Sequence, residues 1–95
     1  MSNEFENKVL RCIDKAIGSL GESVKHAIYW HLEHAKKLKY EESPKKPEEF
    51  IKALESIFGE GTKVLERIIV REISLEFGTS KSESFLEVIK MLKQK

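Results

Sequence analysis

The segment Thr62–Phe77 constrains the fold most, because its apolar residues do not keep to one stripe of a helical projection. They form two rows and a further pair: Val64, Ile68 and Leu75; Leu65, Ile69 and Ile73; and Val70 with Phe77. A helix that is apolar on several sides has to be covered by more than one neighbour. We therefore expect residues 62–77 to be the central helix of a compact, all-α, five-helix bundle.

Apolar residues at three- and four-residue spacing indicate the other helices. Residues 3–17, 20–38 and 47–58 show this spacing, and a last helix follows residue 80. Capping boxes are predicted for Asn3 with Glu6, Ser19 with Glu22, and Ser80 with Glu83. The one long connection, residues 39–46, is interpreted as a solvated loop. No segment alternates with the period of a strand, so residues 1–95 are expected to form a single helical domain.

Composition narrows the choice of partners. Charged residues make up 35% of the chain, yet 17 basic and 16 acidic residues leave a net charge of only +1. This balance disfavours nucleic-acid binding. Such binding would need five lysines to converge with the second helix on one basic face: Lys36, Lys37, Lys39, Lys45 and Lys46. Frequent Lys and Glu with few Asn, Gln, Cys and Met resemble the composition of thermophile proteins.

Cysteine usage and hydropathy indicate the compartment. A single cysteine, Cys12, excludes an internal disulfide and suits a reducing environment. No apolar run is as long as a membrane span, and the first residues lack the apolar core of a signal peptide. We therefore expect a cytoplasmic protein with no membrane partner.

The histidines are the first candidates for chemistry. His31 and His34 lie three residues apart, but a zinc site needs three or four ligands, usually with cysteines, and no H-E-x-x-H motif occurs. Gly59 and Gly61 lack the third glycine and the lysine of a phosphate-binding loop. We therefore expect no metal, no cofactor and no enzymatic activity.

His31 and Glu72 are a candidate buried polar pair. The apolar row predicted for the core side of the second helix is Val24, Ala27, Ile28, Leu32, Ala35 and Leu38, with His31 in its middle. Glu72 projects between the apolar rows of residues 62–77, where an unpaired carboxylate would be unfavourable. Glu72 meets His31, or a basic side chain such as Arg11 or Arg71, inside the bundle, or it reaches the rim of the core instead.

An aromatic stripe on the second helix is the candidate interface. His26, Trp30 and His34 are four residues apart, and Tyr29 lies beside them, outside the predicted core row. Either another helix of the chain covers these side chains or a partner does, since Trp and Tyr are enriched at interface hot spots. Val70 and Phe77, on residues 62–77, are likewise covered either by another helix of the chain or by a partner. We predict a homodimer, or a complex with another protein, that uses these positions.

Three motifs stand out along the chain: L-G-E-S-V at residues 20–24 followed by Tyr29 and Trp30, P-E-E-F at 47–50, and F-G-x-G at 58–61 before an apolar helix. Together they resemble a small archaeal family of helical domains, the Nitrosopumilus-type output domain. The resemblance covers residues 13–77. It transfers no catalytic residue, and because the domain follows signalling modules in some relatives, it implies an output or interaction role.

The sequence thus favours a non-enzymatic interaction or regulatory module that self-associates. The alternative is a small-molecule-binding protein or enzyme with a pocket between helices, in which His31 and Glu72 would be the polar groups. Exposure of Trp30 distinguishes the two, since a filled core with Trp30 at the surface favours the module.

Overall fold

The computed structural model describes residues 4–78 and 84–93. Its helices are α1 (Glu4–Gly18), α2 (Glu22–Lys36), α3 (Pro47–Phe58), α4 (Thr62–Phe77) and α5 (Phe85–Lys93), with 3-10 turns η1 (Tyr40–Glu42) and η2 (Gly59–Gly61). These residues contain no strand, so the all-α prediction is confirmed. The radius of gyration of 12.4 Å is that of a compact domain of this length.

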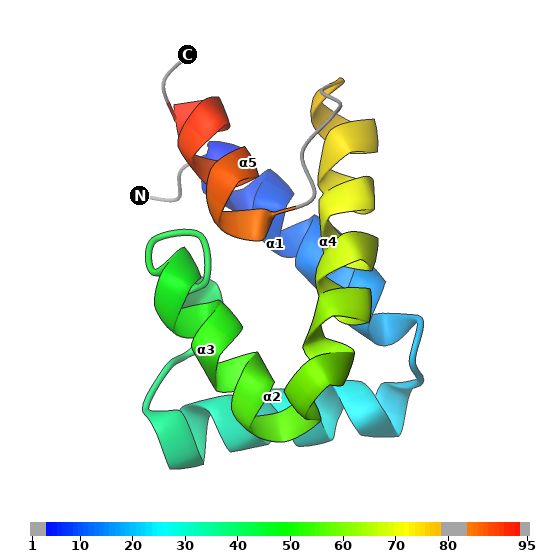
Figure 1. Ribbon diagram of the computed structural model, residues 1–95, viewed down its shortest axis with the longest axis vertical. Coiled ribbons are helices and arrows are strands. Elements are labelled where there is room, and N and C mark those ends of the chain that lie inside the picture. Colours follow the sequence, from blue (N-terminus) through cyan, green and yellow to red (C-terminus); the bar gives the residue numbers. More distant parts are fainter. Residues whose placement is uncertain (1–3, 79–83, 94–95) are drawn as a thin grey trace.

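Helix α4 packs against α1, α3 and α5. Its contact with α1 is antiparallel, since Phe5 near the start of α1 lies 5.7 Å, centroid to centroid, from Phe77 at the end of α4. Four apolar residues of α4 are buried in the core: Leu65, Ile69, Val70 and Ile73. Neighbours thus cover α4 on more than one side, as expected, but they leave Val64 63% exposed and Leu75 74% exposed. Helix α2 lies across one end of the molecule instead of along α4 (Figure 1).

The corner between α1 and α2 differs from the predicted capping box. The Ser19 hydroxyl donates to the Ala16 carbonyl at 2.6 Å, so it closes the last turn of α1 instead of capping α2. Gly21 turns the chain with a φ of 115°, a conformation that glycine adopts without steric penalty, and α2 begins at Glu22. The other two predicted capping boxes involve Asn3, Ser80 and Glu83, which lie outside the described residues.

The connection between α2 and α3 is packed, which corrects its interpretation as a solvated loop. Leu38, Ser43 and Pro44 are buried, and the Tyr40 ring stacks on Tyr29 of α2 with centroids 4.7 Å apart. The Ser43 hydroxyl donates to the Tyr40 carbonyl at 2.7 Å. Burial of these short side chains fixes the position of η1 against the end of α2.

Lys37 ends α2 in a left-handed conformation, with a φ of 56°. We expect Lys37→Gly to raise the free energy of unfolding by about 0.5 kcal/mol, because glycine removes the left-handed strain but gains freedom in the unfolded chain. Lys36→Gly is the matched control, since it removes the same charge inside the helix and should destabilise by up to about 1 kcal/mol. Urea denaturation checks both variants, and equal destabilisation would contradict the role of the left-handed cap.

None of the helices in residues 4–78 and 84–93 combines the length and apolar character that crossing a membrane requires.

Candidate functional site

One side of α2 is attached to α1 through Asp14. The Tyr29 hydroxyl donates to the Asp14 carboxylate at 3.1 Å, and the Lys25 ammonium lies 3.3 Å from the same carboxylate. Burial, with the nearby Asp14 charge and hydrogen bond, raises the pKa of the Tyr29 hydroxyl well above its ordinary value. Tyr29, predicted as an interface residue, is thus half-buried and bonded within the chain.

The core side of α2 is narrower than predicted. Only Ile28 and Leu32 of the helix are buried, whereas Val24, Ala27 and Ala35 from the predicted core row are exposed. Figure 1 shows why: α2 crosses the lower end of the molecule, with the other described helices on its inner side. The outer side of the helix is therefore uncovered.

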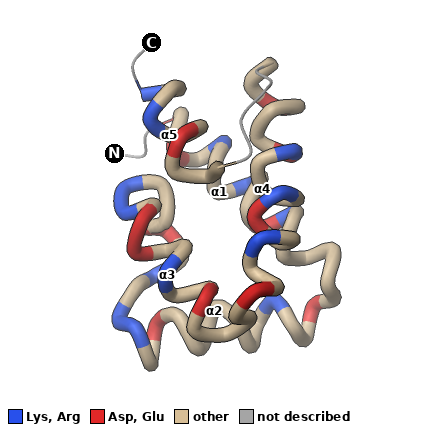
Figure 2. Tube along the Cα trace, viewed as in Figure 1, with Lys and Arg blue, Asp and Glu red and all other residues tan. Residues whose placement is uncertain are grey.

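The outward stripe of α2, which we name the α2 surface, is free of charged residues. It comprises Ser23, Val24, Ala27, Trp30, His31, His34 and Ala35, which helical periodicity places on one side. Trp30 is 62% exposed, and His31 is half-buried. Figure 2 shows charges of both signs over the molecule, whereas the seven residues 26–32 in the middle of α2 include no Lys, Arg, Asp or Glu. Such a stripe contrasts with a chain of which 35% is charged.

Trp30 is held in place although it is exposed. Its ring stacks on His34 with centroids 4.5 Å apart and planes 15° apart. His34 Nδ1 lies 3.0 Å from the Trp30 carbonyl, which accepts a hydrogen bond from that nitrogen. His26, at the edge of the α2 surface, is exposed, and its Nε2 lies 3.9 Å from the Glu22 carboxylate. An exposed aromatic side chain that is already ordered loses little freedom when a partner covers it.

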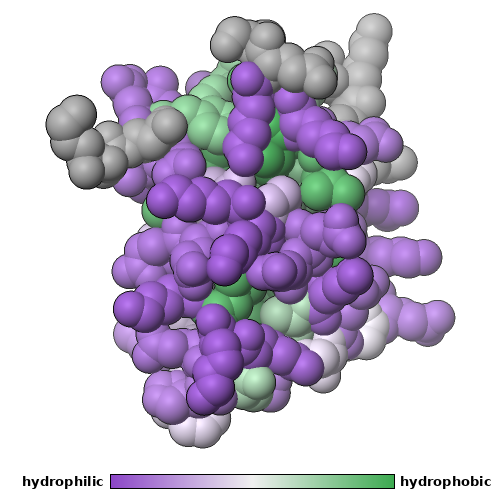
Figure 3. Space-filling view, turned by 90° about the vertical axis from the view of Figure 1, so that its left-hand side faces the viewer, coloured by the Kyte–Doolittle hydropathy of each residue, from purple (hydrophilic) through white to green (hydrophobic). Residues whose placement is uncertain are grey.

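The two most exposed apolar side chains of α4, Val64 and Leu75, lie among charges. On α4, Arg71 falls between Val64 and Leu75 on the same side of the helix. Leu75 also borders a shallow pocket that is otherwise lined mostly by charged residues of α1 and α4, among them Arg11 and Glu76. The left-hand side of the molecule in Figure 1 is mostly hydrophilic (Figure 3). The α2 surface is therefore the better candidate for protein contact.

Two predicted interface residues of α4 pack against other parts of the same chain. Val70 is 3% exposed and belongs to the core, so its prediction as an interface residue is wrong. Phe77 is half-buried: its ring packs on Phe5, and Lys8 Nζ lies 5.8 Å from its centroid. Phe77 is therefore covered by α1, and Val70 lies in the core cluster that the helices share.

The structure does not bring His31 and Glu72 together as a buried pair. Glu72 is half-buried at the contact of α4 with α1, and its carboxylate lies 3.5 Å from Lys15 Nζ. Its backbone carbonyl accepts a hydrogen bond from Cys12 Sγ at 3.5 Å. His31 belongs to α2, which crosses the end of the molecule. Of the two alternatives, the structure supports the one in which Glu72 reaches the rim of the core.

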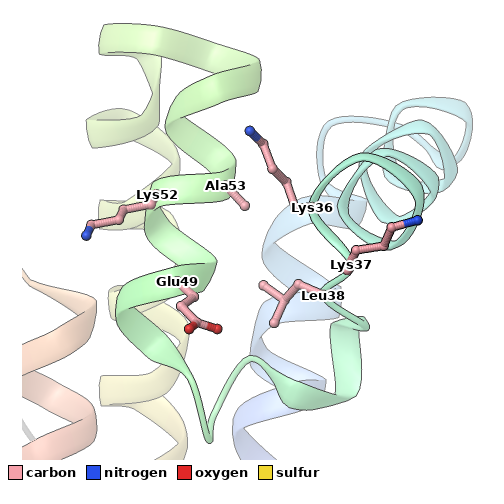
Figure 4. Close-up of a pocket in the computed structure, with 6 residues that line it drawn as sticks. All are labelled: Lys36, Lys37, Leu38, Glu49, Lys52 and Ala53. Carbon is pink, nitrogen blue, oxygen red and sulfur yellow. The ribbon is translucent and has the colours of Figure 1, made fainter.

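Side chains around the pocket between α2 and α3 do not converge. This pocket of about 310 Å³ is lined by Lys36, Lys37, Leu38, Glu49, Lys52 and Ala53. Figure 4 shows Lys37 and Lys52 pointing away from the space between the helices, whereas Lys36, Leu38 and Ala53 face it. Within residues 4–78 and 84–93, no group of three His, Cys, Asp or Glu side chains is placed to hold a metal ion.

The lysines that nucleic-acid binding would require are partly paired with acids. Lys45 Nζ lies 4.0 Å from the Glu6 carboxylate, and Lys46 Nζ lies 3.4 Å from that of Glu42. These acids offset the charge of two of the five lysines, which weakens the attraction of this corner for phosphate.

Sequence reasoning found Trp30, His34 and His26 but missed the small residues around them. These small residues could have been recognised from the lack of charge on one side of the helix. However, an uncharged side is interpreted as part of the core until the position of the helix in the fold is known. Comparison with protein-family models, curated proteins and solved structures found no match to this chain.

Proposed function

We propose that this protein is a non-enzymatic interaction module that self-associates through the α2 surface. The observation that carries the proposal is an exposed stripe without charged side chains, centred on Ala27 and Trp30. Interface centres are depleted of charged residues, and tryptophan is enriched among the residues that contribute most to binding. The output-type role within this proposal rests on the sequence resemblance alone.

A second copy of the chain suits this surface better than a charged partner. A surface built for an oppositely charged partner would carry charges of its own, and the α2 surface contains no Lys, Arg, Asp or Glu. The net charge of +1 gives two copies little reason to repel each other. Two-fold homodimers are also the commonest oligomers, and they use the same patch on both copies.

The size of the surface sets the expected affinity. Helix α2 has 15 residues, which corresponds to a length of about 22 Å. A helix pair of that length falls at the lower end of specific interfaces, below roughly 1,200 Å² of total buried area. We therefore expect a dissociation constant in the micromolar range or weaker, which suits association that responds to protein concentration.

The proposal is tested by measuring the molar mass of the wild type and of Trp30→Ala by light scattering across a concentration series. We expect the wild type to shift from monomer to dimer with concentration, and Trp30→Ala to weaken the dimer by at least tenfold while remaining helical. Leu75→Ala is the matched control, because it removes an apolar side chain of α4 that is even more exposed than Trp30. A monomeric wild type at millimolar concentration, or equal weakening by both variants, would refute self-association through α2.

A further inference from the structure

We propose that the two copies pair through α2 in antiparallel orientation, an inference that rests on the proposed function. The two-fold axis passes at the level of Tyr29, so Val24 of one copy meets His34 of the other and Ala27 meets His31. The two Trp30 side chains then lie next to each other beside the axis. This register overlaps α2 from Ser23 to Ala35 in full, which is the whole extent of the α2 surface.

Side-chain size favours the antiparallel arrangement. Along the middle of the α2 surface, small side chains lie towards its first half, at Val24 and Ala27, and rings lie towards its second half, at His31 and His34. Reversing one helix places Val24 opposite His34 and Ala27 opposite His31, which fills the middle of the contact evenly. In a parallel pair, Ala27 would face Ala27 and His34 would face His34, leaving a gap at one level and crowding at the other.

Helix geometry also favours the antiparallel pair. The small side chain at Ala27 permits an interaxial distance at the short end of the usual range, about 8 Å. Antiparallel α2 helices also place the positive end of one helix dipole beside the negative end of the other. A parallel pair would place like ends together at both termini of the contact.

Engineered cysteines distinguish the two orientations. In the antiparallel pair the α-carbons of residue 34 in the two copies are about 15 Å apart along the axis, beyond the reach of a disulfide, whereas residues 24 and 34 adjoin. We expect His34→Cys alone to give no disulfide dimer under mild oxidation at pH 8. An equimolar mixture of Val24→Cys and His34→Cys should give a substantial fraction of disulfide dimer. A mixture of Ala27→Cys and His31→Cys is the second pair, and it leaves the stacked Trp30 and His34 intact.

The native cysteine, Cys12, does not interfere with the disulfide experiment. Cys12 is buried, and burial with the nearby Glu76 and Glu72 carboxylates raises its pKa to about 11. At pH 8 it remains a neutral thiol, and oxidised wild type should give no disulfide dimer.

The outcomes separate this inference from the proposed function. Disulfide dimer from His34→Cys alone would show a parallel pair, so it would overturn the orientation and leave self-association standing. A dimeric mass with no disulfide product from either mixture would place the contact elsewhere and overturn both. A monomeric mass for the wild type would overturn the proposed function itself, before any question of orientation.

Discussion

Phe85→Ala should lower the free energy of unfolding by about 3–5 kcal/mol, which is a large part of the 5–15 kcal/mol typical of a domain. Phe85 is fully buried, and its ring lies 5.5 Å from that of Phe50, centroid to centroid. Its backbone N–H donates to the Glu66 carboxylate at 2.8 Å, which attaches the start of α5 to α4. Removing the ring would leave a cavity where α3, α4 and α5 meet.

The short length of α5 increases the expected effect. A helix of nine residues is marginal in isolation, so α5 depends on the side chains that it buries. Met91→Ala is the matched control on the same helix, because Met91 is 37% exposed, and its substitution should change stability by less than about 1 kcal/mol. Urea denaturation with an unchanged m-value would assign the loss to the native state. Equal effects of the two variants would contradict the packing role of Phe85.

The bounds of α4 were predictable from the sequence. The segment Thr62–Phe77 was predicted as a helix and is one, since Gly78 follows it with a φ of 69° and donates its N–H to the Ser74 carbonyl. Glycine after an apolar periodic run is the usual helix stop, and this signal is local. Helix α2 ended differently, because Lys37 takes the same left-handed role and lysine carries no such signal.

The placement of α2 was not predictable, and most errors at the candidate site follow from it. Local periodicity cannot decide which of two neighbouring stripes faces the core when both lack charge. Contacts that are distant in sequence decide it here: Tyr29 reaches Asp14, 15 residues away, and stacks on Tyr40. These contacts turn Ile28 and Leu32 inward and leave Ala27 and Trp30 in solvent.

Ala27→Lys should weaken self-association by roughly 100-fold while leaving the fold intact. Ala27 is exposed in a single copy, and lysine is nearly as favourable as alanine within a helix, so circular dichroism and unfolding should change little. In the dimer the new ammonium would enter a surface that contains no carboxylate to pair with it. An unpaired charge at a contact costs about 3 kcal/mol, which corresponds to that loss of affinity.

Two-fold symmetry makes this variant more severe than a single charge, because each copy brings one ammonium to the same contact and the two repel each other. Leu75→Lys is the matched control, since it places the same charge on an exposed apolar position of α4, away from the α2 surface. Sedimentation equilibrium of the two variants and the wild type measures the three dissociation constants. Loss of the dimer in Leu75→Lys with retention in Ala27→Lys would move the interface to α4. Loss of the dimer in Ala27→Lys alone would place the interface on α2. Only at that contact would the two added ammonium groups, one from each copy, come together in a surface without carboxylates.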